Sequence, residues 1–411
     1  MVNRHCWLRA VLLALCSLCI YLFIAGDTVR YPSIAPYYLQ LSEALTQAQT
    51  NIEPSVNIGY DLIHYEGRWY VAQQPLPAIL MMPPVVMLGM ERVSDTAIQI
   101  LIGALNVSLC SLTLSLYLPT LRRWRHIGVV TFFAFGTVYA SVTTMGGVWF
   151  FGQITAVTFL WLYLIALRCR HTVWMGLSAG LVLLSRTSIV PTLIVLSIVW
   201  LWHETRAESS EAFWKALIGY TLGLIPALIF LGAYNRVRFG HPLDFGYAHL
   251  VDAALPQAKR LTYGLFHPAF LQENLEIAFI RPLAFRAECL LRAGCGVVTT
   301  NLEGAGMLWT SPLIFTALFA RPDAYLTRTR LLLIAAAGIL ALLPALLYHN
   351  TGAAQFGYRF LLDALPLLIL LVAAASQRIP RLIWVPLLVY CIAVNLWGAE
   401  WLINALVYAR G

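Results

Sequence analysis

Charged residues are scarce in this sequence, and their scarcity excludes an ordinary soluble domain. Only 11% of the 411 residues are charged, whereas 60% are hydrophobic, and the mean hydropathy is +0.74. Soluble domains are nearer to one-quarter charged and half apolar. Lysine is almost absent, because the 27 basic residues comprise Lys215, Lys259 and 25 arginines. In a chain of this composition, the net charge of +8 reflects membrane topology and anionic head groups rather than nucleic-acid binding.

Other absences narrow the class further. The first apolar segment, 6–25, is long for a signal peptide and lacks a small-residue cleavage site, so we expect a retained transmembrane helix. The eight cysteines have no metal-ligand spacing. Cys289 and Cys295 can form a disulfide only if their segment is not a regular helix, and the sequence leaves this pairing open. No internal repeat is evident, so the sequence predicts one domain over residues 1–411.

Long apolar stretches are abundant, and eleven of them are long enough, or nearly so, to cross a membrane. They lie at 6–25, 97–118, 127–145, 153–168, 172–186, 187–203, 215–233, 306–320, 331–348, 361–376 and 382–403. Short arginine-dense links at 122–126, 168–170, 321–330 and 377–381 are placed in the cytoplasm with the N-terminus by the positive-inside rule. A further apolar stretch, 74–90, is broken by prolines. If it crossed the membrane, the arginine-dense link 122–126 would lie on the outer side, against the positive-inside rule. We therefore predict an interfacial or re-entrant element there.

The acidic residues gather in two long loops on the other side of the membrane. These outer loops span about 26–96 and about 234–305, and they hold seven and six of the 19 acids. Both are too long and too aromatic to lack structure. The predicted fold is therefore an all-α polytopic membrane protein. It has about 11 transmembrane helices, a re-entrant or interfacial segment and two structured outer loops.

Four motifs resemble those of one family of membrane enzymes. They are "GDTVRYPSIAPYY" (26–38), "YEGRWYVAQQPLPAILMMP" (65–83), "GLSAGLVLLSRTSIV" (176–190) and "GAAQFGYRFLLDALPLLILL" (352–371). They are similar to motifs of the GT-C superfamily of polytopic glycosyltransferases, especially the bacterial branch related to protein mannosyltransferases and lipid A aminoarabinose transferases. One position departs from the family pattern. Thr28 stands where relatives often have a second acid, and Asp61 or Glu66 could supply that group.

The resemblance implies an inverting sugar transfer at the outer face of a bacterial cytoplasmic membrane. The donor would be a polyprenyl-phosphate-linked sugar, and the acceptor a lipid, a glycan or a protein. A carboxylate is needed to take the acceptor proton, and arginines pair bidentately with the phosphate. The implied residues are Asp27 as the base, Arg186, Arg359 and Arg30 as phosphate contacts, and Tyr31, Asp61, His64, Arg68 and Gln153 as substrate contacts. No cofactor is expected, although a divalent metal held by two acids stays open.

Each assignment has a plainer alternative. Asp27 can be a solvated acid at the end of a helix, paired with Arg30. Arg359 can pair with Asp363 four residues later. Gln153, predicted on a short outer link, can be a helix cap. These alternatives leave the chemistry of the outer face open.

Two other functions remain compatible with the sequence, namely a lipid or sugar transporter or flippase, and a non-catalytic membrane protein. A transporter should carry charges near the bilayer midplane and interrupted helices in matching halves. Here the predicted crossings are almost free of charge and polar residues crowd one face, which favours an enzyme acting at a surface. The absent second acid keeps the non-catalytic alternative open.

Overall fold

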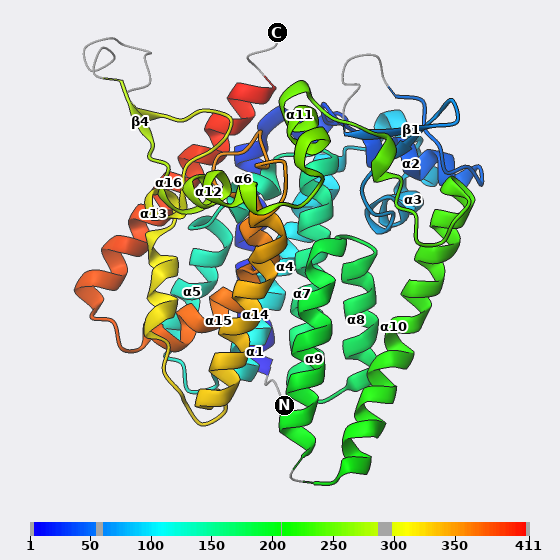
Figure 1. Cartoon of the computed structure of the whole chain (residues 1–411). Helices are drawn as coiled ribbons and strands as arrows, with labels where there is room; N and C mark the ends of the chain where they lie inside the picture. Colours follow the sequence, from blue (N-terminus) through cyan, green and yellow to red (C-terminus); the bar gives the residue numbers. More distant parts are fainter. Residues whose placement is uncertain (1–3, 55–60, 207, 287–297, 408–411) are drawn as a thin grey trace.

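Long apolar helices form the body of the molecule (Figure 1). The computed structural model describes residues 4–54, 61–206, 208–286 and 298–407. Within them, seven helical segments are long and apolar enough to cross a membrane. They contain α1 (Arg4–Ala25), α4 (Asp95–Tyr117), α7 (Val148–Arg168), α9 (Val190–Thr205), α10 (Ser210–Phe239), α14 (Arg328–Leu346) and α16 (Arg381–Leu406). The predicted all-α polytopic membrane class is confirmed.

The four other predicted crossings are shorter or broken. They correspond to α8 (Thr172–Leu183), α15 (Leu365–Ser376), the pair α5 (Arg123–Phe135) and α6 (Tyr139–Thr144), and α13 (Met307–Thr310) with a 3-10 turn at Pro312–Phe319. Pro312 explains the last break, because proline lacks an amide hydrogen and disfavours the helical conformation in the residue before it. Ser311 accordingly has φ −145° and ψ 51°. The predicted positions hold, but two of the eleven elements are not continuous helices.

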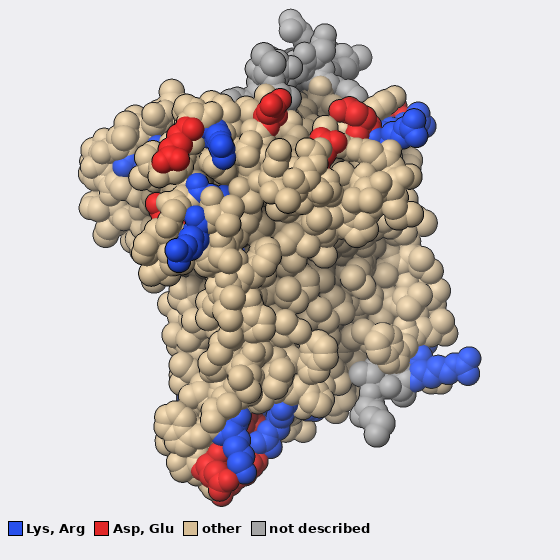
Figure 2. Space-filling view, turned by 90° about the vertical axis from the view of Figure 1, so that its right-hand side faces the viewer, with Lys and Arg blue, Asp and Glu red and all other residues tan. Residues whose placement is uncertain are grey.

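The two ends of the chain lie on opposite faces of the molecule (Figure 1). Both predicted outer loops lie on the face where the C-terminus lies, which we call the loop face. They contain α2 (Tyr37–Thr46), α3 (Leu76–Leu88), α11 (Ala254–Tyr263), α12 (Leu271–Leu275) and five short strands. Figure 2 shows charged side chains near the two ends of the molecule and a wide belt of other residues between them. Such a belt is what a bilayer requires of a spanning protein.

A small β-sheet joins the two outer loops. β1 (Leu62–Tyr65) and β2 (Arg68–Val71) form a hairpin, and β1 also pairs antiparallel with β3 (Leu250–Val251) of the second loop. The hairpin turn has φ 49° at Glu66 and 73° at Gly67, the left-handed pair that a tight two-residue turn needs. A second, two-stranded sheet consists of β4 (Ala284–Phe285) and β5 (Val298–Thr299). Cys289 and Cys295 lie outside the described residues.

The proline-broken segment forms α3, which has the properties of an interfacial helix. Its 13 residues span about 20 Å, less than the roughly 30 Å of a bilayer core. One face buries Ala78 and Met81 against the protein. The end of the helix exposes Val86, Met87 and Leu88, which are 68%, 80% and 54% accessible. Apolar side chains so exposed, beside a buried face, suit a helix lying at the membrane surface.

Glycines bring α8 and α10 into close contact. Gly176 and Gly180 on α8 lie against α10, and Gly219 and Gly223 on α10 lie against α8. A Cβ atom at Gly176 would lie 1.9 Å from the carbonyl oxygen of Tyr220. Small residues four apart allow this approach of two helix backbones. The packing fixes the end of α8, which leads into Arg186 on the loop face.

Candidate active site at the junction of the outer loops

The pairing of β1 with β3 brings two acids together. Leu62 lies opposite Val251, so Asp61 directly precedes β1 where Asp252 directly follows β3. The Asp61 amide donates to the carbonyl oxygen of Val251 at 2.6 Å, which extends the ladder to this point. Asp252 is buried, whereas Asp61 is half-buried. Two carboxyl groups nearly 200 residues apart in the chain therefore share one small region.

The environment of Asp61 favours its protonated form. Burial is the main cause and the negative charge of Asp252 the next, and together they raise the pKa of Asp61 to about 6. The Trp149 indole donates a hydrogen bond of 2.6 Å to Oδ2 of Asp61 and acts in the opposite direction, as does the charge of Arg359. A carboxyl group with such a pKa exchanges protons near neutral pH.

Asp252 is held by an arginine from α11. Arg260 Nε lies 2.7 Å from Asp252 Oδ2, and Arg260 Nη2 donates to the carbonyl of Leu250 at 2.6 Å. Asp252 thus has a fixed cationic partner, whereas Asp61 accepts the neutral indole hydrogen bond given above and contacts the Asp252 carboxyl group. The described residues contain no group of three or more His, Cys, Asp or Glu placed to hold a metal ion.

Arg359 is buried beside this pair and is fixed by backbone carbonyls. Its Nε donates to Gly352 O at 2.7 Å, and its Nη1 donates to Trp149 O at 3.1 Å. Gln153 adds a two-way contact, because its Nε2 donates to Arg359 O at 3.1 Å and its Oε1 accepts from Nη1 at 3.4 Å. Burial, and after it the charge of Arg186, lower the pKa of Arg359 to about 10. Arg359 therefore stays cationic at neutral pH.

Arg186 forms a two-pronged ion pair with a buried acid. Its Nε and Nη2 lie 2.7 and 2.8 Å from the two carboxylate oxygens of Asp363, and Ser188 donates to the same group at 3.1 Å. The Arg186 side chain keeps 18% exposure, whereas that of Asp363 keeps 1%. The guanidinium carbon also lies 5.4 Å from the ring centroid of Phe360. A partly exposed arginine held in one orientation can meet an anion arriving from the loop face.

The structure brings four of the predicted site residues together. With the groups that hold them they form the loop-junction cluster: Asp61, Trp149, Gln153, Arg186, Asp252, Arg359 and Asp363. Gln153 was expected on a short link, but it lies inside α7, because the helix already begins at Val148 after Gly147, whose φ is 116°. Asp363 pairs with Arg186 instead of Arg359, its predicted alternative partner.

Asp27 and Arg30 lie elsewhere on the loop face. They form a 3.3 Å ion pair, and their side chains are 71% to 73% exposed. Asp27 and Tyr31 line a pocket of about 220 Å³ with Thr96, Met145 and others, and no member of the loop-junction cluster lines it. The roles assigned to Asp27, Arg30 and Tyr31 stay predictions.

His64 and Arg68 lie near the tip of the β1–β2 hairpin and are exposed. The ring of His64 packs on Trp69, with a centroid distance of 4.4 Å. Both side chains are close in sequence to Asp61, yet they are exposed and the register places them on opposite faces of the hairpin. Their substrate contacts also stay predictions.

Sequence reasoning did not identify Asp252 or Trp149. Asp252 follows a strand of only two residues, Leu250–Val251, and Trp149 stands in an apolar run that reads as part of a membrane helix. Only the pairing of distant segments shows that both contact Asp61. Asp363 was visible in the sequence, but the choice between Arg186 and Arg359 as its partner depends on tertiary packing.

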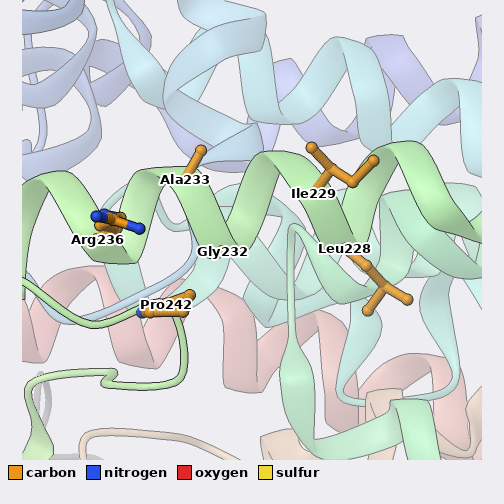
Figure 3. A pocket seen from close by; sticks show the side chains of 6 residues that line it. All are labelled: Leu228, Ile229, Gly232, Ala233, Arg236 and Pro242. Atoms are coloured by element: carbon orange, nitrogen blue, oxygen red, sulfur yellow. The ribbon is translucent and has the colours of Figure 1, made fainter.

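A groove of about 410 Å³ lies along α10, away from the cluster, and is lined by Leu228, Ile229, Gly232, Ala233, Arg236 and Pro242. Figure 3 shows Leu228, Ile229 and Ala233 spaced along the helix, with Arg236 at one end of the set. The opposite side of α10, including Leu231 and Arg238, is buried in the protein. The groove therefore opens on the outward face of a membrane-spanning helix.

No family model and no curated protein matches this sequence. Among solved structures, the chain is similar to ArnT from Cupriavidus metallidurans. The structure of ArnT bound to undecaprenyl phosphate gives a TM-score of 0.53 with 12% identity, covering 91% of this chain and 62% of ArnT. The apo structure of ArnT gives a TM-score of 0.50 with 13% identity, covering 91% and 61%. The chain spans about three-fifths of the length of ArnT, and its fold is similar to the fold of that part of ArnT.

Proposed function

We propose that this protein is an inverting glycosyltransferase that uses a polyprenyl-phosphate-linked sugar at the outer face of a bacterial cytoplasmic membrane. The observation that carries the proposal is Asp61, a half-buried carboxyl group with a pKa of about 6, near the cationic Arg359, which in turn lies near Arg186. A base with a pKa near the working pH is suited to proton transfer. The fold shared with ArnT supports the reaction class.

In the proposed step, a hydroxyl oxygen of the acceptor attacks the anomeric carbon of the donor. The bond from that carbon to the phosphate oxygen breaks, and its electron pair leaves with the phosphate. Asp61 takes the hydroxyl proton, and Trp149 orients the carboxylate through its 2.6 Å hydrogen bond. A single displacement of this kind inverts the anomeric configuration.

The two arginines are assigned to the phosphate. Arg359 stays charged, and Gln153 holds it through a contact in each direction. The guanidinium group of Arg186 is partly exposed, and its ion pair with Asp363 fixes its orientation. Arginine suits this role because its planar fork matches phosphate oxygens. ArnT was solved with undecaprenyl phosphate, which supports a lipid phosphate of the same class for this chain. The acceptor is a lipid, glycan or protein hydroxyl.

The proposal is tested by transfer of labelled sugar from polyprenyl-phosphate donors by the purified full-length protein. Asp61→Asn removes the base but keeps the size of the side chain, so we expect a loss of roughly 10²-fold or more in turnover. Asp27→Asn is the matched control, because Asp27 is exposed and paired with Arg30. We expect it to stay within a few-fold of wild type.

The same pair of variants decides between the two acids. Full loss in Asp27→Asn with an active Asp61→Asn would assign the base to Asp27, as the sequence predicts. If wild type transfers no sugar from any donor tested, the proposed function is wrong.

A further inference from the structure

The opposite face of the molecule carries a basic feature that the proposed reaction does not use. Five arginines from the links 122–126 and 377–381 form it, and we call them the arginine patch: Arg122, Arg123, Arg125, Arg378 and Arg381. The links are joined, because Arg125 Nη2 donates to the carbonyl of Ile379 at 2.5 Å. The ring of Trp124 lies 3.9 Å from the guanidinium carbon of Arg125 and 4.5 Å from that of Arg381. α16 runs from this patch to the loop face.

The positive charge of the patch has no protein counter-charge. Among the described residues, no ion pair joins an acid to any of the five arginines. α5 and α16 both begin within the patch, and neither has an acid in its first turn. The N-terminus of a helix carries about half a positive charge, so these two ends add to the excess. The patch is suited to an anion.

Two buried donors, one in the patch and one beside it, have no acceptor among the described residues. Arg125 is 4% exposed, and its Nη1 has no hydrogen-bond partner in the part of the chain that the structure describes. The same holds for Nε1 of Trp384, which is fully buried. The guanidinium carbon of Arg125 lies 5.2 Å from the ring centroid of Trp384. Burial, and after it the charges of Arg381 and Arg122, lower the pKa of Arg125. An anionic group with several acceptor oxygens at the exposed arginines would offset the positive charge gathered around Arg125.

The surface next to the patch indicates what carries the anion. Directly after Arg381, α16 exposes Leu382 at 89% and Ile383 at 52%, and one turn later Val385 and Val389 are also exposed. A free phosphate would make no use of this apolar surface. The head group and acyl chains of a phospholipid would cover the arginines and the apolar residues together.

We propose that the arginine patch binds the phosphate of an anionic phospholipid, whose acyl chains lie along the first turns of α16. The phosphate oxygens accept from the exposed guanidinium groups of Arg122 and Arg381, and the charge of nearby Arg125 adds to the attraction. This site lies on the face opposite the loop-junction cluster, so it is separate from the proposed donor site. It does not depend on the proposed function.

The test is the binding of phosphatidylglycerol to the purified full-length protein in detergent, measured by native mass spectrometry. The double variant Arg122→Gln with Arg381→Gln removes two exposed charges. We expect binding to weaken about thirtyfold, which corresponds to about 1 kcal/mol for each arginine removed. The matched control exchanges Arg321 and Arg328, two exposed arginines of the link 321–330, for glutamine. It should bind as wild type does.

Phosphatidylcholine and inorganic phosphate are the other arms of the experiment. The proposal requires that phosphatidylcholine binds more weakly than phosphatidylglycerol, and that inorganic phosphate neither binds as tightly nor displaces the lipid at matched concentration. Equal binding of phosphatidylglycerol by wild type and the double variant would overturn it. So would equal binding of the two lipids or a site satisfied by phosphate alone. Unfolding temperatures measured in phosphatidylcholine check that both variants are folded.

Discussion

At the scale of single residues, the chemistry of the loop face depends on the different surroundings of two neighbouring acids, Asp61 and Asp252. Asp61 and Asp252 lie side by side, yet Arg260 pairs with Asp252, whereas the neutral Trp149 indole is bonded to Asp61. Like charges that share a small region push one group toward its neutral form. Asp61 is that group, because no cation among the described residues forms an ion pair with it.

The pH dependence of sugar transfer should reveal the raised pKa of Asp61. We expect the activity to fall on the acid side with an apparent pKa near 6, the value for Asp61. Asp252→Asn removes the neighbouring negative charge, so the acid limb should move to lower pH. The measurement is the rate at low substrate concentration between pH 4.5 and 8 for both proteins, with the assay range chosen to bracket about pH 6. An acid limb that stays in place in Asp252→Asn would disprove the coupling.

The raised pKa of Asp61 should also lower the free energy of unfolding at neutral pH, where the buried carboxyl group is ionised. The pKa of Asp61 is raised from 3.8 in the unfolded chain to about 6, so its favourable contribution is complete below pH 3.8 and is lost as the pH rises through 6. Asp61→Asn cannot ionise, and it should therefore be more stable than wild type at pH 7, by at most about 3 kcal/mol. Thermal unfolding in detergent at pH 7 and pH 4 measures this. An equal gain at both pH values would show that ionisation is not the cause.

At the scale of elements, the cluster depends on contacts between backbones. The β1–β3 pair sets Asp61 against Asp252, and the glycine contact of α8 with α10 sets the turn that carries Arg186. Neither contact involves a side chain of the cluster. Changes at these elements should therefore affect the cluster from a distance.

Gly176→Ala tests the helix contact. The added Cβ would lie 1.9 Å from a carbonyl oxygen of α10, so the helices must move apart, at a cost of about 1–3 kcal/mol. Gly232→Ala on the outward face of α10 is the control, because its Cβ would meet only Pro242 Cβ at 3.5 Å. We expect a lower unfolding temperature and lower activity for Gly176→Ala alone. Equal behaviour of the two variants would contradict the close packing.

At the scale of the whole molecule, the two faces differ in the charged residues that they carry. The loop face holds most of the acids and the loop-junction cluster, and the opposite face holds the arginine-dense links. The charge-poor belt between them is the surface that a bilayer would cover (Figure 2). The proposed reaction requires the loop face to be outside the cell.

This orientation can be tested with single-cysteine variants. In a protein whose other cysteines are serine, Arg68→Cys on the loop face should react with a membrane-impermeant maleimide in intact spheroplasts. Cys169, exposed on the link after α7, should react only after the membrane is permeabilised. Labelling in the reverse order would place the loop face in the cytoplasm and would rule out outer-face catalysis.

The sequence by itself determined the solvent, the positions of the apolar elements and the presence of two structured loops. These properties depend on composition and on local runs of residues, as with the proline-rich run 74–90, whose helix α3 has only 13 residues and is too short to span. It also identified Asp61, Gln153, Arg186 and Arg359 as candidate site residues. Each is a polar residue predicted in or next to the outer face of the membrane.

Only the tertiary structure decided which of these groups meet. The pairing of β1 with β3 joins residues far apart in the chain, and it selects Asp252 as the neighbour of Asp61. In the same way, tertiary packing makes Arg186 the ion-pair partner of Asp363, although Arg359 is nearer in sequence. A pKa near 6 or a fixed ion pair arises from burial and from charges that surround a group in space. Sequence distance does not encode either of them.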